Sequence, residues 1–113
     1  MKQWLLTFAL AVSFSAFSTE RIVTIGGDVS EIVFALGEGD KVVARDSTSQ
    51  KPTELLTLPD VGYMRMLNPE GILSMNPTLV LTSELAKPSL ALKQLQDSGV
   101  EVIQITGKAA LEA

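Results

Sequence analysis

Residues 21–44 read RIVTIGGDVSEIVFALGEGDKVVA, and this stretch decides the fold. Its first part, residues 21–25, is rich in β-branched side chains and predicts a strand that stops at two glycines. Apolar residues then recur at helical spacing up to Gly37, and residues 41–44 predict a second strand. A strand, a helix and a strand in this order favour a parallel sheet with the helix packed on one face.

The start of this helix carries the pattern Asp28-Val29-Ser30-Glu31, which is that of a capping box. We therefore expect the Asp28 side chain to cap the helix. The capping box also accounts for both carboxylates, which could otherwise form a pair with chemistry of its own. Gly26-Gly27 lacks the spacing of either nucleotide-binding fingerprint, so the favoured interpretation is a tight turn.

The alternation of strands and helices continues along the chain. Further strands are predicted at 78–82 and 100–106, and helical segments at 52–58, 69–76 and 88–98. The sequence therefore predicts an α/β fold of Rossmann-like type, with a parallel sheet flanked by helices.

Two of the helices carry further signals. Asn68 precedes Pro69, which is the arrangement of an N-cap followed by a proline at the first helical position. In the longer helix Leu90, Leu92 and Leu95 are spaced for one apolar face. We expect that face to pack on the sheet.

A polar loop, DSTSQKPT at residues 46–53, follows the second strand. Asp46 and the hydroxyl residues after it could bind a carboxylate group of a ligand. A solvated loop is the favoured interpretation, because clusters of such residues between regular elements mark surface loops.

The composition excludes several classes of function. The 113 residues include no Cys and no His, which excludes disulfides, thiol catalysis, a Ser-His-Asp triad and His-ligated zinc or heme from this chain alone. The balance of 9 basic and 13 acidic residues gives a net charge of −4. A nucleic-acid partner is disfavoured, because affinity for phosphates comes largely from Lys and Arg.

The N-terminus has the three parts of a secretory signal peptide. Lys2 supplies a positive charge, residues 4–14 (WLLTFALAVSF) form an apolar run, and Ala16-Phe17-Ser18 is an acceptable cleavage site. We expect residues 1–18 to be removed and residues 19–113 to form the exported domain. A buried N-terminal helix or a membrane anchor is the alternative, although the run is short for a bilayer core of ~20 apolar residues.

The segment VGYMRMLNPE, residues 61–70, places the only tyrosine, Tyr63, on a loop. In open α/β sheets, ligands bind at loops beyond the carboxyl ends of the strands. A phenolate is a known ligand of ferric heme, and the Arg65 guanidinium would favour the charged form of the phenol. Soft apolar contact to a macrocycle could come from Met64, Met66 and Leu67. A half-buried surface tyrosine is the alternative.

Three longer stretches, residues 21–52, 58–84 and 88–105, carry a resemblance to a known family. They resemble the N-terminal lobe of bilobed periplasmic substrate-binding proteins of the helical-backbone class, also called class III or the cobalamin and siderophore type. That class serves bacterial ABC importers of heme, cobalamin and ferric siderophores. Because of VGYMRMLNPEGIL, residues 61–73, the chain is most similar to the heme-binding members.

This resemblance implies roles for individual residues. In the heme-binding members, the tyrosine of the motif ligates the heme iron and the arginine two residues on interacts with the phenolate, which places these roles on Tyr63 and Arg65. In the wider class, a glutamate that opens the following helix docks on an arginine of the permease, and Glu70 has that place. The implied protein is periplasmic, is not an enzyme, and delivers heme to an inner-membrane ABC permease, with an outer-membrane heme receptor further upstream.

Two other functions remain open. One is a carrier of a ferric siderophore or cobalamin, and the other is a small nucleotide-dependent α/β enzyme, disfavoured by the missing phosphate fingerprint. Members of the family have two lobes that enclose heme, and the second lobe brings a second axial ligand in some of them. The chain stops where residues 109–113 would begin a helix, so we expect it to be the first lobe of a longer, truncated protein.

Overall fold

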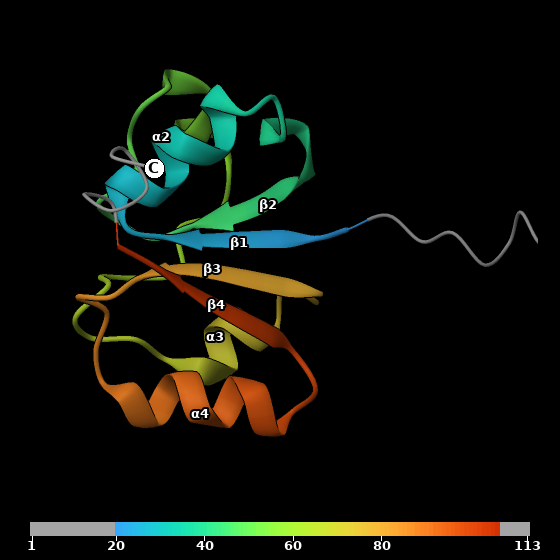
Figure 1. The fold of residues 1–113 in the computed structure, drawn as a ribbon, viewed down its shortest axis with the longest axis vertical. Helices are drawn as coiled ribbons and strands as arrows, with labels where there is room; N and C mark the ends of the chain where they lie inside the picture. The colour runs from blue at the N-terminus through green and yellow to red at the C-terminus, as the bar shows by residue number, and fades with distance from the viewer. Residues whose placement is uncertain (1–19, 107–113) are drawn as a thin grey trace, which may run out of the picture.

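The computed structural model describes residues 20–106, which form a four-stranded parallel sheet (Figure 1). The strands are β1 (Ile22–Ile25), β2 (Val42–Arg45), β3 (Leu79–Ser83) and β4 (Glu101–Ile105). Their order across the sheet is β2-β1-β3-β4, and every neighbouring pair is parallel. The α/β fold expected from the sequence is confirmed.

Helices cover both faces of this sheet (Figure 1). The helical segments are α2 (Gly27–Ala35), η1 (Gly39–Lys41), η2 (Thr53–Thr57), α3 (Pro69–Leu73) and α4 (Ser89–Asp97). The α2 helix lies on one face, and α3 and α4 lie on the other. The chain leaves β1 toward β2 on one side and returns to β3 on the other, so the sheet has a topological switch point between β1 and β3.

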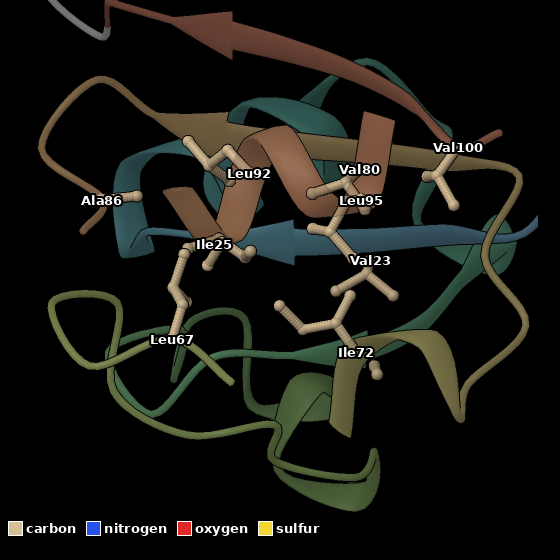
Figure 2. Packing of buried hydrophobic residues seen from close by; sticks show 11 residues of the cluster. Val23, Ile25, Leu67, Ile72, Val80, Ala86, Leu92, Leu95 and Val100 are labelled. Carbon is tan, nitrogen blue, oxygen red and sulfur yellow. The ribbon is translucent and has the colours of Figure 1, made fainter. Parts of the chain in front are cut away.

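The alternation of side chains along β1 divides the core into two clusters. Val23 and Ile25 face α3 and α4, where Leu95 and Ile72 pack against them (Figure 2). Ile22 belongs to the cluster under α2, together with Val29, Val33, Val42 and Leu55. Each face of the central strand is thereby buried, as a parallel sheet requires.

The start of α2 differs from the expected capping box. The helix begins at Gly27 with Gly26 at the N-cap, and no side chain caps it. Gly26 has φ of +108°, which lets the chain turn from β1 into the helix two residues earlier than an Asp28 cap would. Asp28 therefore lies in the first turn, where its negative charge still favours the positive end of the helix.

The start of α3 matches its sequence signals. The Asn68 Oδ1 accepts a hydrogen bond from the Glu70 N–H at 3.0 Å, and Pro69 is the first helical residue. The expected apolar face of α4 is only partly right. Leu92 and Leu95 are buried, but Leu90 is 61% exposed, because residues two apart on a helix face different directions.

Two expectations concern residues outside the described part of the chain. The signal peptide at 1–18 and the helix start at 109–113 both lie there. Between residues 20 and 106, no helix has the length and apolar character needed to cross a membrane.

Candidate ligand-binding site

A hollow of about 250 Å³ lies at the carboxyl ends of β1 and β3. It is lined by Gly26, Gly27, Asp28, Thr48, Met64, Ser83 and Leu85. Its position at the switch point is the place where open α/β sheets bind ligands. The sequence pointed to Met64 in this hollow and, among the hydroxyl residues after Asp46, to Thr48, whereas Ser83 and Leu85 carry no local signal that marks them as site residues.

The loop with Tyr63 lies beside this hollow, because Met64 is part of its lining. Tyr63 and Met66 are the ends of a tight turn closed by a hydrogen bond from the Met66 N–H to the Tyr63 carbonyl at 2.9 Å. The side chain of Tyr63 is 44% exposed and that of Met66 is 76% exposed, and Arg65 is also exposed. The turn thus presents a phenol, a guanidinium and a thioether to solvent.

Two of the apolar residues in this segment face inward. Met64 is partly buried against the core under α3 and α4, and it also reaches the hollow. Leu67 is fully part of that core (Figure 2). The expectation that Leu67 contacts a macrocycle is therefore wrong, because its side chain is used to pack the loop onto the sheet.

The Tyr63 loop is held in place on its downstream side by backbone bonds to Lys87. The Lys87 N–H donates to the Met64 carbonyl at 2.7 Å, and the Leu67 N–H donates to the Lys87 carbonyl at 3.0 Å. These two bonds tie the turn to the segment that leads into α4. The phenol of Tyr63 is consequently carried on a backbone with a fixed position relative to the carboxyl end of β3.

The upstream side of the loop pairs with the end of β2. Arg45 donates its N–H to the Pro59 carbonyl at 3.0 Å and accepts from the Val61 N–H at 2.8 Å. Arg45 and Asp60 form an isolated parallel bridge. The approach to Tyr63 therefore runs as a short extension of the sheet beyond β2.

Two side chains of the polar loop after β2 are buried, whereas Thr48, Gln50, Lys51 and Thr53 are exposed, so the expectation of a solvated loop is only partly right. Asp46 and Ser49 have no exposed surface. The Asp46 Oδ1 accepts from the Gly26 N–H at 2.9 Å and from the Ser49 hydroxyl at 2.6 Å, and its Oδ2 accepts from the Thr48 hydroxyl at 2.7 Å. The carboxylate is occupied by the protein itself, so it supports the wall of the hollow and does not face a ligand.

Glu70 lies apart from these contacts, in the first turn of α3. Its side chain is exposed, and its N–H is taken by the Asn68 cap. An exposed carboxylate in this place is free to meet a cationic partner. Among residues 20–106, no group of three or more acidic side chains is placed to hold a metal ion.

Comparison with known proteins identifies the family to which this architecture belongs. The family model described as periplasmic binding protein matches residues 22–110, and the chain belongs to that family. The expectation drawn from the sequence resemblance is confirmed at this level.

Several individual relatives are similar to the chain. The periplasmic heme-binding protein RhuT from Roseiflexus sp. RS-1, in apo form, is 49% identical with a TM-score of 0.74, over 79% of this chain and 34% of that one. The periplasmic vitamin B12-binding protein BtuF of Vibrio cholerae is 32% identical with a TM-score of 0.69, over 75% of this chain and 33% of that one. The uncharacterized ABC transporter substrate-binding lipoprotein YvrC of Bacillus subtilis (strain 168) is 36% identical over 76% of this chain and 28% of its own length.

The chain therefore spans about a third of the length of these relatives. They are binding proteins and not enzymes, as expected for this chain, and this overturns the nucleotide-dependent enzyme as an alternative.

Proposed function

We propose that this chain is the first lobe of the substrate-binding component of an ABC importer, and that its substrate is heme. The observation that carries the proposal is the exposed Tyr63 on an anchored turn beside the hollow at the carboxyl edge of the sheet. A phenolate oxygen is a hard donor that suits ferric iron, and it is an established axial ligand of heme. The chain offers no His or Cys for that role.

The surroundings of Tyr63 fit a flat apolar ligand with a charged metal at its centre. Apolar surface is supplied by the exposed Met66 on the same turn as Tyr63 and by the exposed Leu85 in the lining of the hollow. Arg65, two residues after Tyr63 on the same turn, adds an exposed positive charge to this surface. A hollow of about 250 Å³ holds only part of a tetrapyrrole, so the other face of the ligand requires a second wall. We expect this wall, and in some family members a second axial ligand, to come from a second lobe.

Sequence identity to solved structures supports heme as the first candidate and cobalamin as the second. The heme-binding RhuT shares 49% of the aligned residues, whereas the vitamin B12-binding BtuF shares 32%. Cobalamin is the second candidate, because proteins named for vitamin B12 binding are also similar to the chain. A ferric siderophore is the remaining alternative within the class.

The location and the partners are part of the same proposal. A protein of this kind works outside the cytoplasm and passes its ligand to an inner-membrane ABC permease, and we propose that residues 1–18 are the signal for export. An outer-membrane heme receptor would supply the ligand. Mass spectrometry of the periplasmic fraction is expected to find a folded product without Met1 and Lys2, and an intact N-terminus on that product would contradict the export step.

Titration of the chain with ferric hemin tests the ligand. We expect weak binding with a high-spin spectrum and a tyrosinate charge-transfer band. Tyr63→Phe keeps the ring and removes the donor oxygen, so it should abolish the band and weaken binding. Arg65→Ala should weaken binding less and leave the band in place.

Metal-free protoporphyrin and cyanocobalamin are the controls for this titration. Protoporphyrin has no iron for the phenolate, so its binding should be the same in the Tyr63→Phe variant. Tighter binding of cyanocobalamin than of hemin would favour the second candidate. An unchanged ferric spectrum and affinity in Tyr63→Phe would show that this loop is not the iron site.

A further inference from the structure

The carboxylate of Asp60, three residues before Tyr63, joins two segments of the chain. Its Oδ1 accepts from the Ser47 hydroxyl at 2.9 Å and from the Gly62 N–H at 2.8 Å. Its Oδ2 lies 3.7 Å from Nη1 of Arg45. One side chain thus connects the loop after β2 to the residue that immediately precedes Tyr63.

Both backbone polar groups of Gly62, its N–H and its carbonyl, are hydrogen-bonded. Its N–H donates to Asp60, and its carbonyl accepts from the Ser47 N–H at 2.9 Å. Gly62 has φ of +108°, a conformation that glycine adopts readily and that residues with a side chain rarely adopt. Because the Tyr63 backbone continues directly from this constrained glycine, the bonds to Gly62 determine the direction in which the Tyr63 side chain leaves the loop.

The two sides of the loop are anchored by different means. Downstream, the bonds to Lys87 are between backbone groups, which any sequence could make. Upstream, the backbone bonds of Arg45 and Ser47 are joined by a side-chain anchor, because the Asp60 carboxylate accepts two further hydrogen bonds. The ion pair with Arg45 is long and half exposed on the Asp60 side, so it contributes little compared with the hydrogen bonds.

We infer that Asp60 is a positioning residue for Tyr63: its Oδ1 fixes the Gly62 turn so that the phenol is presented at the carboxyl edge of the sheet. The assignment of Tyr63 as an iron ligand rests on the function proposed above. The positioning itself concerns only the hydrogen-bond geometry around Gly62. Geometry rather than charge is the essential property of the Asp60 side chain.

Two substitutions separate geometry from charge. Asp60→Asn removes the charge but keeps an oxygen acceptor in the same place, whereas Asp60→Glu keeps the charge and moves the acceptor by one methylene. Asp97→Asn and Asp97→Glu are the matched controls, since Asp97 is an exposed residue at the end of α4. Each variant is made in the full chain.

The first measurement needs no ligand. Tyr63 is the only tyrosine, so the ring signals of a chain with labelled tyrosine report on this residue alone. In Asp60→Glu we expect hydrogen exchange of the Gly62 amide to be about tenfold faster and the Tyr63 ring signals to shift, because the amide loses its acceptor. Asp60→Asn and both Asp97 variants should match the unmodified chain. Unmodified behaviour of Asp60→Glu, or an equal disturbance in Asp60→Asn, would overturn the inference.

The second measurement is the hemin titration. Asp60→Glu should bind ferric hemin about tenfold more weakly and show a reduced charge-transfer band. Asp60→Asn should retain the affinity and the band of the unmodified chain. Should Tyr63→Phe titrate like the unmodified chain, the heme proposal fails, and the Gly62 and Tyr63 signals still decide the role of Asp60. Should Tyr63→Phe lose the band while Asp60→Glu keeps full affinity and undisturbed signals, only the role of Asp60 fails.

Discussion

The buried carboxylate of Asp46 accepts a hydrogen bond from the backbone N–H of Gly26 at 2.9 Å, which ties the end of β2 to the turn that ends β1. The Ser49 hydroxyl, which donates to the same Asp46 oxygen, also lies 2.7 Å from the Ser30 hydroxyl in α2. One wall of the ligand hollow is therefore fixed by a buried polar network that no solvent reaches.

We expect Asp46→Ala to lower the free energy of unfolding by about 3 kcal/mol, because it leaves the buried Gly26 N–H without an acceptor and removes the carboxylate to which the Ser49 and Thr48 hydroxyls donate. Asp46→Asn keeps one acceptor oxygen and should cost less. Urea denaturation followed by circular dichroism measures both. Asp28→Ala, an exposed aspartate in the first turn of α2, is the control and should change stability by no more than about 1 kcal/mol. Equal effects of Asp46→Ala and Asp28→Ala would show that the network adds nothing to stability.

Gly26→Ala should be destabilising by about 1–3 kcal/mol from backbone conformation alone, since its φ is +108°. An added Cβ would also lie 2.8 Å from Cβ of Ser83, which lines the same hollow. Gly71→Ala in α3 is the matched control, because a Cβ there meets no atom within 4 Å. That change should stabilise the protein by about 0.5–1 kcal/mol. The same denaturation experiment compares the two, and a Gly26→Ala protein as stable as the unmodified chain would refute the constraint.

Local sequence signals were sufficient for the order of elements and for much of the core. The β-branched run at 21–25 forms a strand and the Asn68-Pro69 pair starts a helix. Both depend only on neighbouring residues, so both can be predicted from the sequence. The predicted Asp28 cap is wrong because Gly26, with its positive φ, starts the helix two residues earlier. No local pattern distinguishes these two possibilities.

The candidate site was predictable only in part. Tyr63, Arg65 and Met66 lie on an exposed turn, as a ligand loop requires. The burial of Asp46 was not predictable, because its main partner, Gly26, is 20 residues away in the sequence. Contacts of this kind arise from the register of β1 against β2, which composition and periodicity do not contain.

The two faces of α4 provide a test of the core. Leu95→Ala should cost about 2–5 kcal/mol, because the side chain is fully buried against β1 and β3. Leu90→Ala makes the same chemical change on the exposed side of the same helix and should stay within about 0.5 kcal/mol. Thermal unfolding of the two variants measures the difference. A large loss in Leu90→Ala would mean that another part of the protein covers this face in solution.

Glu70→Ala tests the proposed contact with the permease. The exposed carboxylate is expected to meet a cationic group of the partner, so its removal should slow association and reduce the dependence of the rate on salt. Binding to the purified permease at two salt concentrations measures this. Hemin affinity should stay unchanged, and Glu31→Ala, which removes an exposed carboxylate from α2, should leave association unchanged. A loss of hemin affinity in Glu70→Ala would instead assign this residue to the ligand site.

Substitutions of the two methionines in the Tyr63 loop should distinguish a loss of ligand contact from a loss of core packing. Met66 is 76% exposed, so Met66→Ala should leave stability within about 0.5 kcal/mol and weaken hemin binding about fivefold through lost apolar contact. Met64 packs on the core and lines the hollow, so Met64→Ala should lower stability by about 1–2 kcal/mol and weaken hemin binding as well.

Met75 completes this comparison, because it packs on the same cluster as Met64 but follows α3 and lies next to Arg21, at the start of β1. Met75 therefore lies near the amino end of β1, whereas the hollow lies at the carboxyl ends of the strands. Met75→Ala should therefore lower stability by about as much as Met64→Ala, roughly 1–2 kcal/mol, and leave hemin affinity unaltered. Hemin titration and urea denaturation of the three variants give two independent readings. Should Met66→Ala bind hemin as tightly as the unmodified chain, the exposed side of the turn does not face the macrocycle, and the orientation proposed for Tyr63 is wrong.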